Sequence, residues 1–304
     1  MHTRPKNQSL GAVAAALVFA LALLAQPAAA GGAGTTGESG AGTGTADATA
    51  GTAAGTAGGP GVTGRTPTAA GAGRTGTAQP GPGDGHVYAV RPRDNGVVEY
   101  AVYTPAQGVT PAQLYQRLKE QGVHGLRDPQ TPLAAYACTY GTARALDNGY
   151  CPPARWRWNG FADPQVYFRD FTPDAWPVRE SVADWNRAYG VDSYWTLGSC
   201  PTGGRHCVGV HAANYGANGW NGLTVYSLDS GRYFIDGSVV INFNTYYAAT
   251  AADRRNSTCH EIGHALGVGH NLSTASCVYS PDIWSNPQYP HSSDYNLLRY
   301  VIYP

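Results

Sequence analysis

One short segment of the sequence holds residues whose types and spacing could bind a metal ion. From His260 to His270 it reads HEIGHALGVGH, which has the form H-E-x-x-H-x-x-G-x-x-H. On a helix, residues four apart share a face, so His260 and His264 can direct imidazole nitrogens at one ion. Gly267 permits the left-handed backbone that ends a helix sharply, and the chain can then turn back. The spacing therefore predicts a metal site with His260, His264 and His270 as ligands.

The same segment predicts a catalytic rather than a structural zinc site. Three protein ligands leave the fourth position of a tetrahedral zinc ion open for water. Glu261 lies one step round the helix from His260, where its carboxylate reaches a zinc-bound water without binding the ion. A carboxylate so placed can act as the catalytic base. The long motif is highly specific, and the plain alternative is a solvated, histidine-rich helix end.

The elements that must position these residues follow from the hydrophobic pattern and from helix start and stop signals. Apolar residues at helical spacing indicate helices, and short runs rich in β-branched residues indicate strands. The predicted elements are a helix from about Ala251 to Leu266 that carries the motif, a helix opened by Thr172-Pro173 and closed by Gly190 with Val178, Val182, Trp185 and Tyr189 along it, and strands at Val166–Phe168, Leu223–Tyr226 and Val239–Phe243.

The first 85 residues differ in composition from the rest of the chain. Residues 1–30 have a basic start, an apolar run from Leu10 to Ala25 and a small-residue end, which together predict a secretory signal peptide. Residues 31–85 are mostly Gly, Ala and Thr and are expected to form a disordered linker, because they can bury little apolar surface. The apolar run from Leu10 to Ala25 is too short for a membrane span. We therefore expect a secreted, extracellular protein with no membrane attachment after signal removal.

Residues 86–135 are predicted to form a small α+β module, either a propeptide or an accessory domain. Strands are expected at Val87–Val90 and Val97–Tyr103 around the turn from Arg93 to Gly96. A short helix should begin at Thr110-Pro111 and stop at Gly122. The remainder, 136–304, is predicted to be one catalytic domain. Only 13% of residues are charged and the net charge is zero, which argues against a nucleic-acid partner.

The six cysteines all lie after residue 135. An even count in an exported chain predicts disulfides rather than free thiols. Their clustering favours pairing between sequence neighbours, although sequence alone leaves other pairings open. The favoured pairs are Cys138–Cys151, Cys200–Cys207 and Cys259–Cys277.

The zinc motif resembles that of the metzincin metallopeptidases, and within them the matrixins, residue for residue. In matrixins a turn beneath the zinc carries a methionine eight residues after the third histidine, followed by Tyr. Here that position is Val278, followed by Tyr279. Leu223–Tyr226 resembles the family's edge strand, which pairs with an extended substrate, and Asp294 resembles the acidic residue that supports the turn. The resemblance covers about Trp156 to Tyr303.

The resemblance implies a metzincin-like α/β fold with a twisted, mainly parallel but mixed sheet and an active-site helix. It implies a zinc metalloendopeptidase that hydrolyses peptide bonds in protein or peptide substrates, with one catalytic zinc. We also expect the secreted protein to be a monomer. Two features depart from the family. The only methionine is Met1, so the turn lacks its methionine, and the P-R-C-G-type cysteine switch of matrixin propeptides is absent.

Other residues carry weaker signals. Cys200, His206, Cys207 and His211 could form a second metal site, but a disulfide loop with solvated histidines is favoured in an exported chain. In the same way, a calcium site and a plain turn both remain open for Asp229 and Asp236, the turn being favoured. His291 and Asp294 are expected to start the last helix.

Two other classes of function compete with the peptidase. One is a non-catalytic zinc-binding or adhesion module derived from a metallopeptidase, which the missing methionine favours. The other is a structural domain attached to a surface by the Gly/Ala/Thr-rich linker. Glu261 argues against the first, because a binding module needs no base there. The zinc motif argues against the second, because it would have no purpose.

Overall fold

A computed structural model describes residues 85–304, except 130–137, 147–150, 152, 231 and 280–286. The predicted signal peptide (1–30) and, apart from Gly85, the predicted linker (31–85) lie outside the described residues. So does the predicted boundary between the N-terminal module and the catalytic domain at 135/136. All described residues belong to one compact unit.

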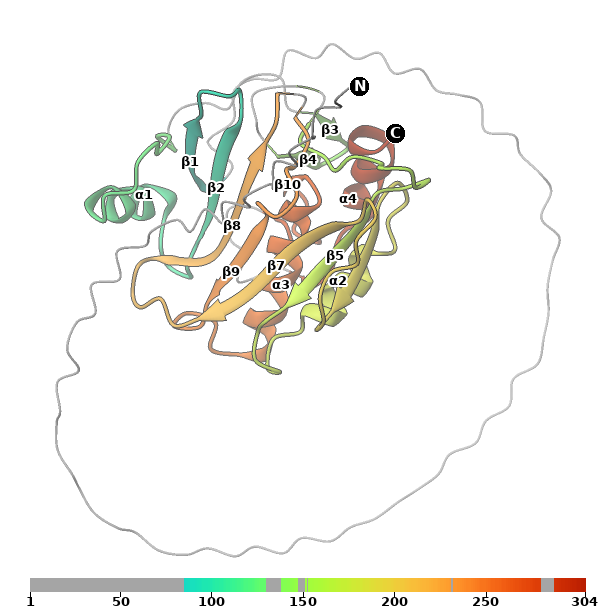
Figure 1. Cartoon of the computed structure of the whole chain (residues 1–304). Coiled ribbons are helices and arrows are strands. Elements are labelled where there is room, and N and C mark those ends of the chain that lie inside the picture. Colours follow the sequence, from blue (N-terminus) through green and yellow to red (C-terminus); the bar gives the residue numbers. More distant parts are fainter. Residues whose placement is uncertain (1–84, 130–137, 147–150, 152, 231, 280–286) are drawn as a thin grey trace, which may run out of the picture. The chain divides into compact units, whose positions relative to one another are not determined.

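A seven-stranded sheet runs through the described chain in the order β1-β2-β8-β9-β7-β5-β6 (Figure 1). Within it, β5 pairs in parallel with β6 and β7, and β7 with β9, whereas the β8–β9, β2–β8 and β1–β2 pairs are antiparallel. The predicted α/β fold with a twisted mixed sheet is confirmed, although the sheet is evenly mixed rather than mainly parallel. The strands are β1 (Val87–Pro92), β2 (Val98–Pro105), β5 (Gln165–Asp170), β6 (Asp192–Thr196), β7 (His206–Ala213), β8 (Trp220–Leu228) and β9 (Val240–Asn244).

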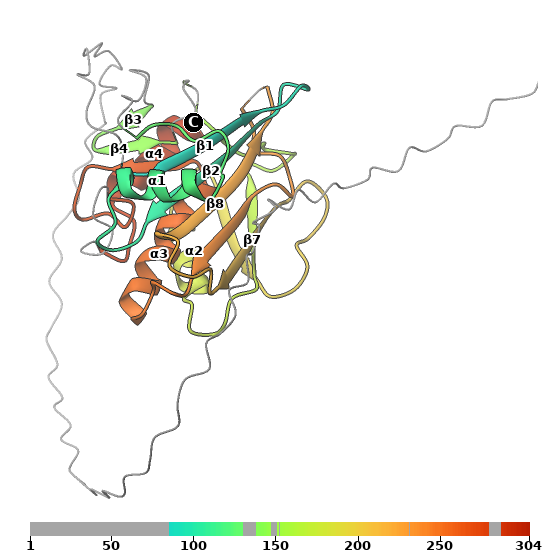
Figure 2. The same cartoon turned by 90° about the vertical axis from the view of Figure 1, so that its left-hand side faces the viewer.

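Two helices, α2 (Val178–Trp185) and α3 (Ala251–Ala265), pack against each other and cover one face of this sheet (Figures 1 and 2). Helix α3 contacts β8 and β9, and α2 contacts β6. The side chain of Thr250 accepts a hydrogen bond from the Asp253 amide, so a capping box starts α3 close to its predicted position. The core between helices and sheet contains large, fully buried side chains, among them Trp156, Phe168, Trp185, Tyr226, Ile241 and Ile262.

A second, three-stranded sheet and the C-terminal helix lie beside the end of α3 (Figure 1). Its order is β10-β4-β3, formed by β10 (Val268–Asn271), β4 (Ala143–Ala145) and β3 (Thr139–Tyr140). Helix α4 (Ser292–Leu297) packs on β3 and β4 and continues into a π-helical turn, Leu298–Ile302. His291 caps α4 and Asp294 completes its capping box, as predicted for this helix start.

The start predicted for α2 was wrong. The helix begins at Val178 rather than at Thr172-Pro173, because Thr172 is held in a turn by its amide and hydroxyl bonds to the Asp170 carboxylate, at 2.9 and 2.8 Å. Pro177 then disfavours a helical conformation at the residue before it. Tyr189, predicted on the helix, lies beyond its end and is 68% exposed.

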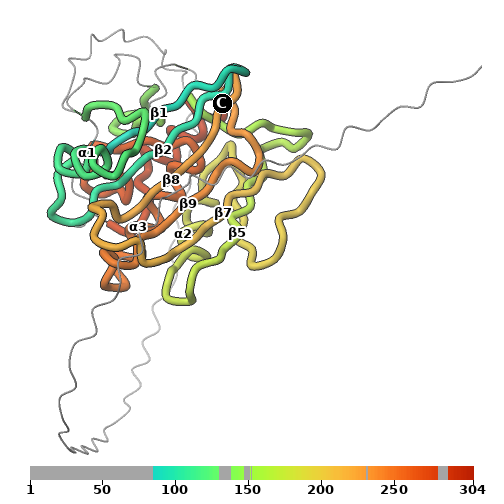
Figure 3. Tube along the Cα trace, turned by 60° about the vertical axis from the view of Figure 1, so that its left-hand side comes forward, coloured from blue at the N-terminus to red at the C-terminus, as the bar shows by residue number. Residues whose placement is uncertain are grey.

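The N-terminal hairpin joins the main sheet. Its two strands and helix α1 (Pro111–Glu120) form where the sequence predicts them, with Leu114 and Leu118 buried. Strand β2 pairs with β8 from Val98 to Pro105, so that β1, β2 and β8 lie side by side (Figure 3). The strand that resembled a free substrate edge is therefore an inner strand of this chain's own sheet.

No helix in the described ranges combines the length and hydropathy needed to cross a bilayer.

Candidate metal centre

The structure brings the three histidines of the motif together. His260 and His264 lie on α3 with ring centroids 4.6 Å apart, and His270 lies on β10. Gly267, with a φ of +97°, makes the reversal between the two elements, and a Cβ there would press against the carbonyl oxygen of Ala154. Only glycine meets both demands without strain.

A fourth histidine, His86, completes the cluster. His86, His260, His264 and His270 each offer one nitrogen, these nitrogens lie within 4.8 Å of one another, and all four residues are buried. Sequence analysis missed His86, which immediately precedes β1 and lies 174 residues from His260. No spacing pattern links residues so far apart, and only the pairing of β2 with β8 places them together.

The geometry of the cluster fits a single tetrahedral ion. His86 Nε2 lies 3.0 Å from His260 Nε2 and 3.2 Å from His270 Nε2. Ligand nitrogens about 2.0–2.1 Å from a tetrahedral zinc ion are separated by roughly 3.4 Å. These two separations are close to this value, and all four nitrogens lie within 4.8 Å of one another, so the described cluster can close around one metal ion.

Backbone carbonyl groups orient two of the imidazoles. His260 Nδ1 lies 3.0 Å from the carbonyl oxygen of Cys277, and His264 Nδ1 lies 2.8 Å from that of Val268. A hydrogen bond from Nδ1–H to a carbonyl fixes the tautomer and leaves Nε2 as the nitrogen offered to a metal. Burial lowers the pKa of His260 well below its ordinary value, and the nearby His264 and His270 add smaller effects in the same direction. The ring is therefore neutral, as a metal ligand must be.

Glu261 lies fully buried between α3 and the sheet. Its Oε1 accepts a hydrogen bond from Thr104 Oγ1 of β2, and its Oε2 accepts one from Thr224 Oγ1 of β8, both at 2.6 Å. Burial raises the pKa of Glu261 to about 7, although the two hydroxyl bonds oppose this by stabilising the carboxylate. A Cβ at Gly222 of β8 would collide with this carboxylate, so the strand approaches it closely only because that residue is glycine.

The turn beneath the cluster lies where the matrixin resemblance placed it. Val278 is fully buried, and its side chain lies against Gly263 on α3. Asp294, also buried, accepts hydrogen bonds from Ser276 Oγ and from Asn271 Nδ2, both at 2.6 Å. The carboxylate thus ties α4 both to the turn and to β10, which carries His270.

All three predicted disulfides are confirmed. Cys138 bonds to Cys151, Cys200 to Cys207 and Cys259 to Cys277. None of the six cysteines is free. A zinc-bound thiol is therefore not available in this chain, in agreement with the absent cysteine switch.

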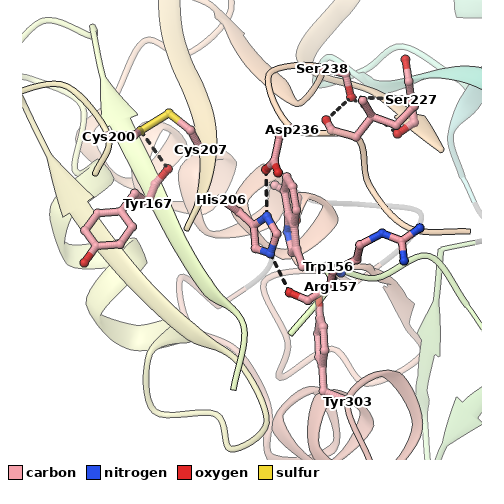
Figure 4. Close-up of polar contacts among 12 residues, drawn as sticks. Trp156, Arg157, Tyr167, Cys200, His206, Cys207, Ser227, Asp236, Ser238 and Tyr303 are labelled. Atoms are coloured by element: carbon pink, nitrogen blue, oxygen red, sulfur yellow. Dashed lines mark hydrogen bonds and ion pairs between the residues drawn. A yellow bond between two sulfur atoms is a disulfide. The ribbon is translucent and has the colours of Figure 1, made fainter. Parts of the chain in front are cut away.

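His206 and His211 do not join a metal cluster within the described residues. His206 is buried rather than solvated: its Nδ1 pairs with Asp236 at 2.8 Å and its Nε2 with the Arg157 carbonyl at 2.6 Å, and its ring stacks on Trp156 (Figure 4). The nearby Cys200–Cys207 disulfide is the loop that the sequence favours. These contacts make His206 a packed core residue.

The two aspartates weighed for calcium also have other roles. Asp229 pairs with Arg157 and accepts the Tyr233 amide, and Asp236 pairs with His206. Neither aspartate belongs to a metal-binding group in the described part of the chain. The turn is therefore the better description of this segment.

Comparison with known proteins finds similarity to solved structures. No family model matches the sequence, and no curated protein matches it. The chain is similar to a solved structure titled "Structure of myroilysin", with 19% identity and a TM-score of 0.25 over 38% of this chain. The match spans 52% of that chain, about half its length. The function of the chain is therefore inferred from its site residues.

Proposed function

We propose that this protein is a secreted zinc-dependent endopeptidase, with His260, His264 and His270 as zinc ligands and Glu261 as the catalytic base. The observation that carries the proposal is a buried carboxylate beside convergent histidines. Thr104 Oγ1 lies 2.6 Å from the Glu261 carboxylate and 2.8 Å from His86 Nε2, so the carboxylate is two hydrogen-bond lengths from the cluster. A site that only stored zinc would have no use for a base there.

The chemistry divides between the metal and the protein. Bound zinc would polarise the scissile carbonyl and lower the pKa of a coordinated water to about 7. Glu261 would take the proton from the attacking water and deliver it to the leaving amine. The hydrogen bond from Thr224 would hold the Glu261 side chain in one orientation while the carboxylate gains and loses a proton.

The substrate would be a protein or peptide bound in an extended conformation. The edge of β8 that faces away from β9 pairs antiparallel with an extended segment, β2, over the whole length of β2. A substrate strand would use the same backbone groups by β-augmentation. Three disulfides support export of the protein to an oxidising compartment.

The direct test is digestion of a peptide library by the purified protein, with sequencing of the products. Cleavage should depend on zinc, stop with 1,10-phenanthroline and return when zinc is restored. Activity that survives exhaustive chelation would refute a metallopeptidase. Because the N-terminal hairpin covers β8, the library should be tested before and after removal of that hairpin, as described below.

One observation favours a second candidate, a non-catalytic zinc-binding module. Four histidine ligands would close the coordination sphere, which is the mark of a structural zinc site. A protein of this kind would bind zinc tightly and cleave nothing, whatever the state of its hairpin. The same library experiment therefore separates the two candidates.

A further inference from the structure

A substrate would need access to the edge of β8 and to the histidine cluster. One segment of this chain covers both. Thr104, Tyr103 and Val102 of β2 pair with Gly222, Leu223 and Thr224 of β8, which is the stretch of β8 beside Glu261. His86, at the start of the same hairpin, points its Nε2 at the nitrogens of His260 and His270. The segment from His86 to Pro105 thus covers the strand edge and the histidine cluster together.

We propose that His86 is a fourth metal ligand supplied from within the chain, and that residues 86–105 hold the protein in a latent form. The latent role rests on the proposed peptidase function, whereas the ligand role does not. His86 would occupy the position that catalysis leaves open to water, and β2 would occupy the edge that binds substrate. The device needs no thiol, since all six cysteines are in disulfides.

The burial of the segment shows that it is tightly docked. His86 is 3% exposed, and Val87, Ala101 and Val102 are fully buried. The Thr104 hydroxyl bonds the Glu261 carboxylate, so β2 also contacts the proposed base. A substrate could reach neither Glu261 nor the metal until this segment leaves.

A different role for His86 must be separated from this one. Its Nε2 lies 2.8 Å from Thr104 Oγ1, and a protonated Nε2 could donate to that oxygen instead of binding an ion. The two roles exclude each other, because a nitrogen that carries a proton has no lone pair for a metal. Thr104→Val removes the hydroxyl and keeps the shape. If His86 binds the metal, this variant keeps four histidine ligands.

The first experiment counts ligands in the full chain. X-ray absorption of the zinc protein should give four imidazoles in the wild type and in Thr104→Val, and three in His86→Ala. In the cobalt-substituted protein, azide should alter the visible spectrum of His86→Ala only. His86→Gln, which keeps a polar side chain, provides a second variant if His86→Ala folds poorly. His124→Ala, an exposed histidine of the same module, is the matched control and should behave as wild type.

Azide binding to the wild-type cobalt protein as strong as to His86→Ala would overturn the ligand role. So would three imidazoles in the wild-type zinc protein. Three imidazoles in the wild type but four in Thr104→Val would assign His86 to the hydroxyl rather than to the metal. Release of zinc to a competing chelator should be at least about tenfold faster in His86→Ala than in the wild type.

The second experiment removes the segment. A recognition site for a specific protease is inserted after α1 between Gly122 and His124, which are both exposed. The same site is inserted at exposed Gly203–Gly204 as a control. The Cys200–Cys207 disulfide retains both sides of the control cut. Cutting after α1 should release a fragment that carries His86, and should raise cleavage of the peptide library at least about tenfold. The control cut should release no fragment and should leave peptide cleavage unchanged.

Three outcomes separate latency from the peptidase function itself. Equal, chelator-sensitive cleavage before and after release would overturn latency and leave the peptidase standing. A fragment that stays bound even in His86→Ala would also overturn latency, because a removable inhibitor must dissociate. A fragment that leaves, with a metal open to azide and no peptide cleaved, would support the ligand role and refute the peptidase.

Discussion

The hydroxyl of Thr104 donates a 2.6 Å hydrogen bond to the carboxylate of Glu261, across a separation of 157 residues. This bond joins the N-terminal hairpin to the motif helix at an acidic side chain beside the histidine cluster. Burial nevertheless outweighs the hydrogen bonds, and the pKa of Glu261 rises to about 7. The folded state therefore favours the protonated carboxyl more than the unfolded chain does.

That pKa makes the stability of the metal-free protein depend on pH. A carboxyl with a raised folded pKa costs stability as the pH rises above its unfolded value of 4.5 and through about 7. Glu261→Gln removes this cost. Its free energy of unfolding, relative to wild type, should therefore rise by about 3 kcal/mol from pH 5 to pH 8. Urea unfolding of both proteins in a chelator measures the difference. Glu180→Gln, exposed on α2, should show no such change.

The helix that carries the motif could be predicted from the sequence, whereas the position of His86 in the cluster could not. Helix α3 follows from its capping residues and the four-residue histidine spacing, both of which act within a few turns of chain. His86 enters through a strand pairing that joins segments more than a hundred residues apart. Any strand with a suitable face could pair with β8, and the sequence pattern alone does not select β2.

The start of α2 shows a similar limit at short range. Thr172-Pro173 has the composition of a helix start. The carboxylate of Asp170, at the end of β5, accepts hydrogen bonds from both the amide and the hydroxyl of Thr172, and so a turn forms there instead of a helix start. Thr172 does make local hydrogen bonds, as such a residue does at a helix start. Its partner is the side chain of Asp170, however, and not the backbone of a first helical turn.

Zinc should bind at about one ion per chain and should depend on the clustered histidines alone. His264→Ala removes a buried candidate ligand and should weaken zinc affinity by at least about a hundredfold. His211→Ala is the matched control, because that half-buried ring stacks on Phe171 away from the cluster. Metal analysis of the dialysed proteins, followed by competition with a chromophoric chelator, measures both. Equal zinc loss from the two variants would contradict this assignment.

Glu261→Gln should separate metal binding from turnover. The amide keeps the size of the side chain but cannot accept the proton from water, so we expect peptide cleavage to fall at least about a hundredfold. Zinc content should not change, because the carboxylate is not a ligand. The comparison uses the form of the protein from which the hairpin has been released. Near wild-type turnover in this variant would assign the base to another residue.

The last prediction concerns the turn beneath the metal, where Val278 replaces the expected methionine. Cys277 contributes both a disulfide to Cys259 and, through its carbonyl oxygen, a 3.0 Å hydrogen bond to His260 Nδ1. Cys259 immediately precedes His260, so the disulfide fixes the turn to the residue beside the first candidate ligand. We predict that this bridge takes over part of the supporting role of the methionine. The competing explanation is an ordinary crosslink, worth roughly 3 kcal/mol for a loop of this length in the chain-entropy estimate.

A double mutant separates these explanations. If the bridge positions His260, Cys259→Ala with Cys277→Ala should lower zinc affinity by at least about tenfold, beyond any effect of the lost stability. Adding Val278→Met, which supplies the expected methionine in place of the lost bridge, should restore part of that affinity. The matched control, Cys200→Ala with Cys207→Ala, removes a disulfide outside the cluster and should lower stability alone. Zinc affinity and urea unfolding measured on all three proteins decide the matter. If Cys259→Ala with Cys277→Ala lowers stability and leaves zinc affinity unchanged, the bridge is an ordinary crosslink. The hydrogen bond from His260 Nδ1 to the carbonyl of residue 277 would then form without the disulfide.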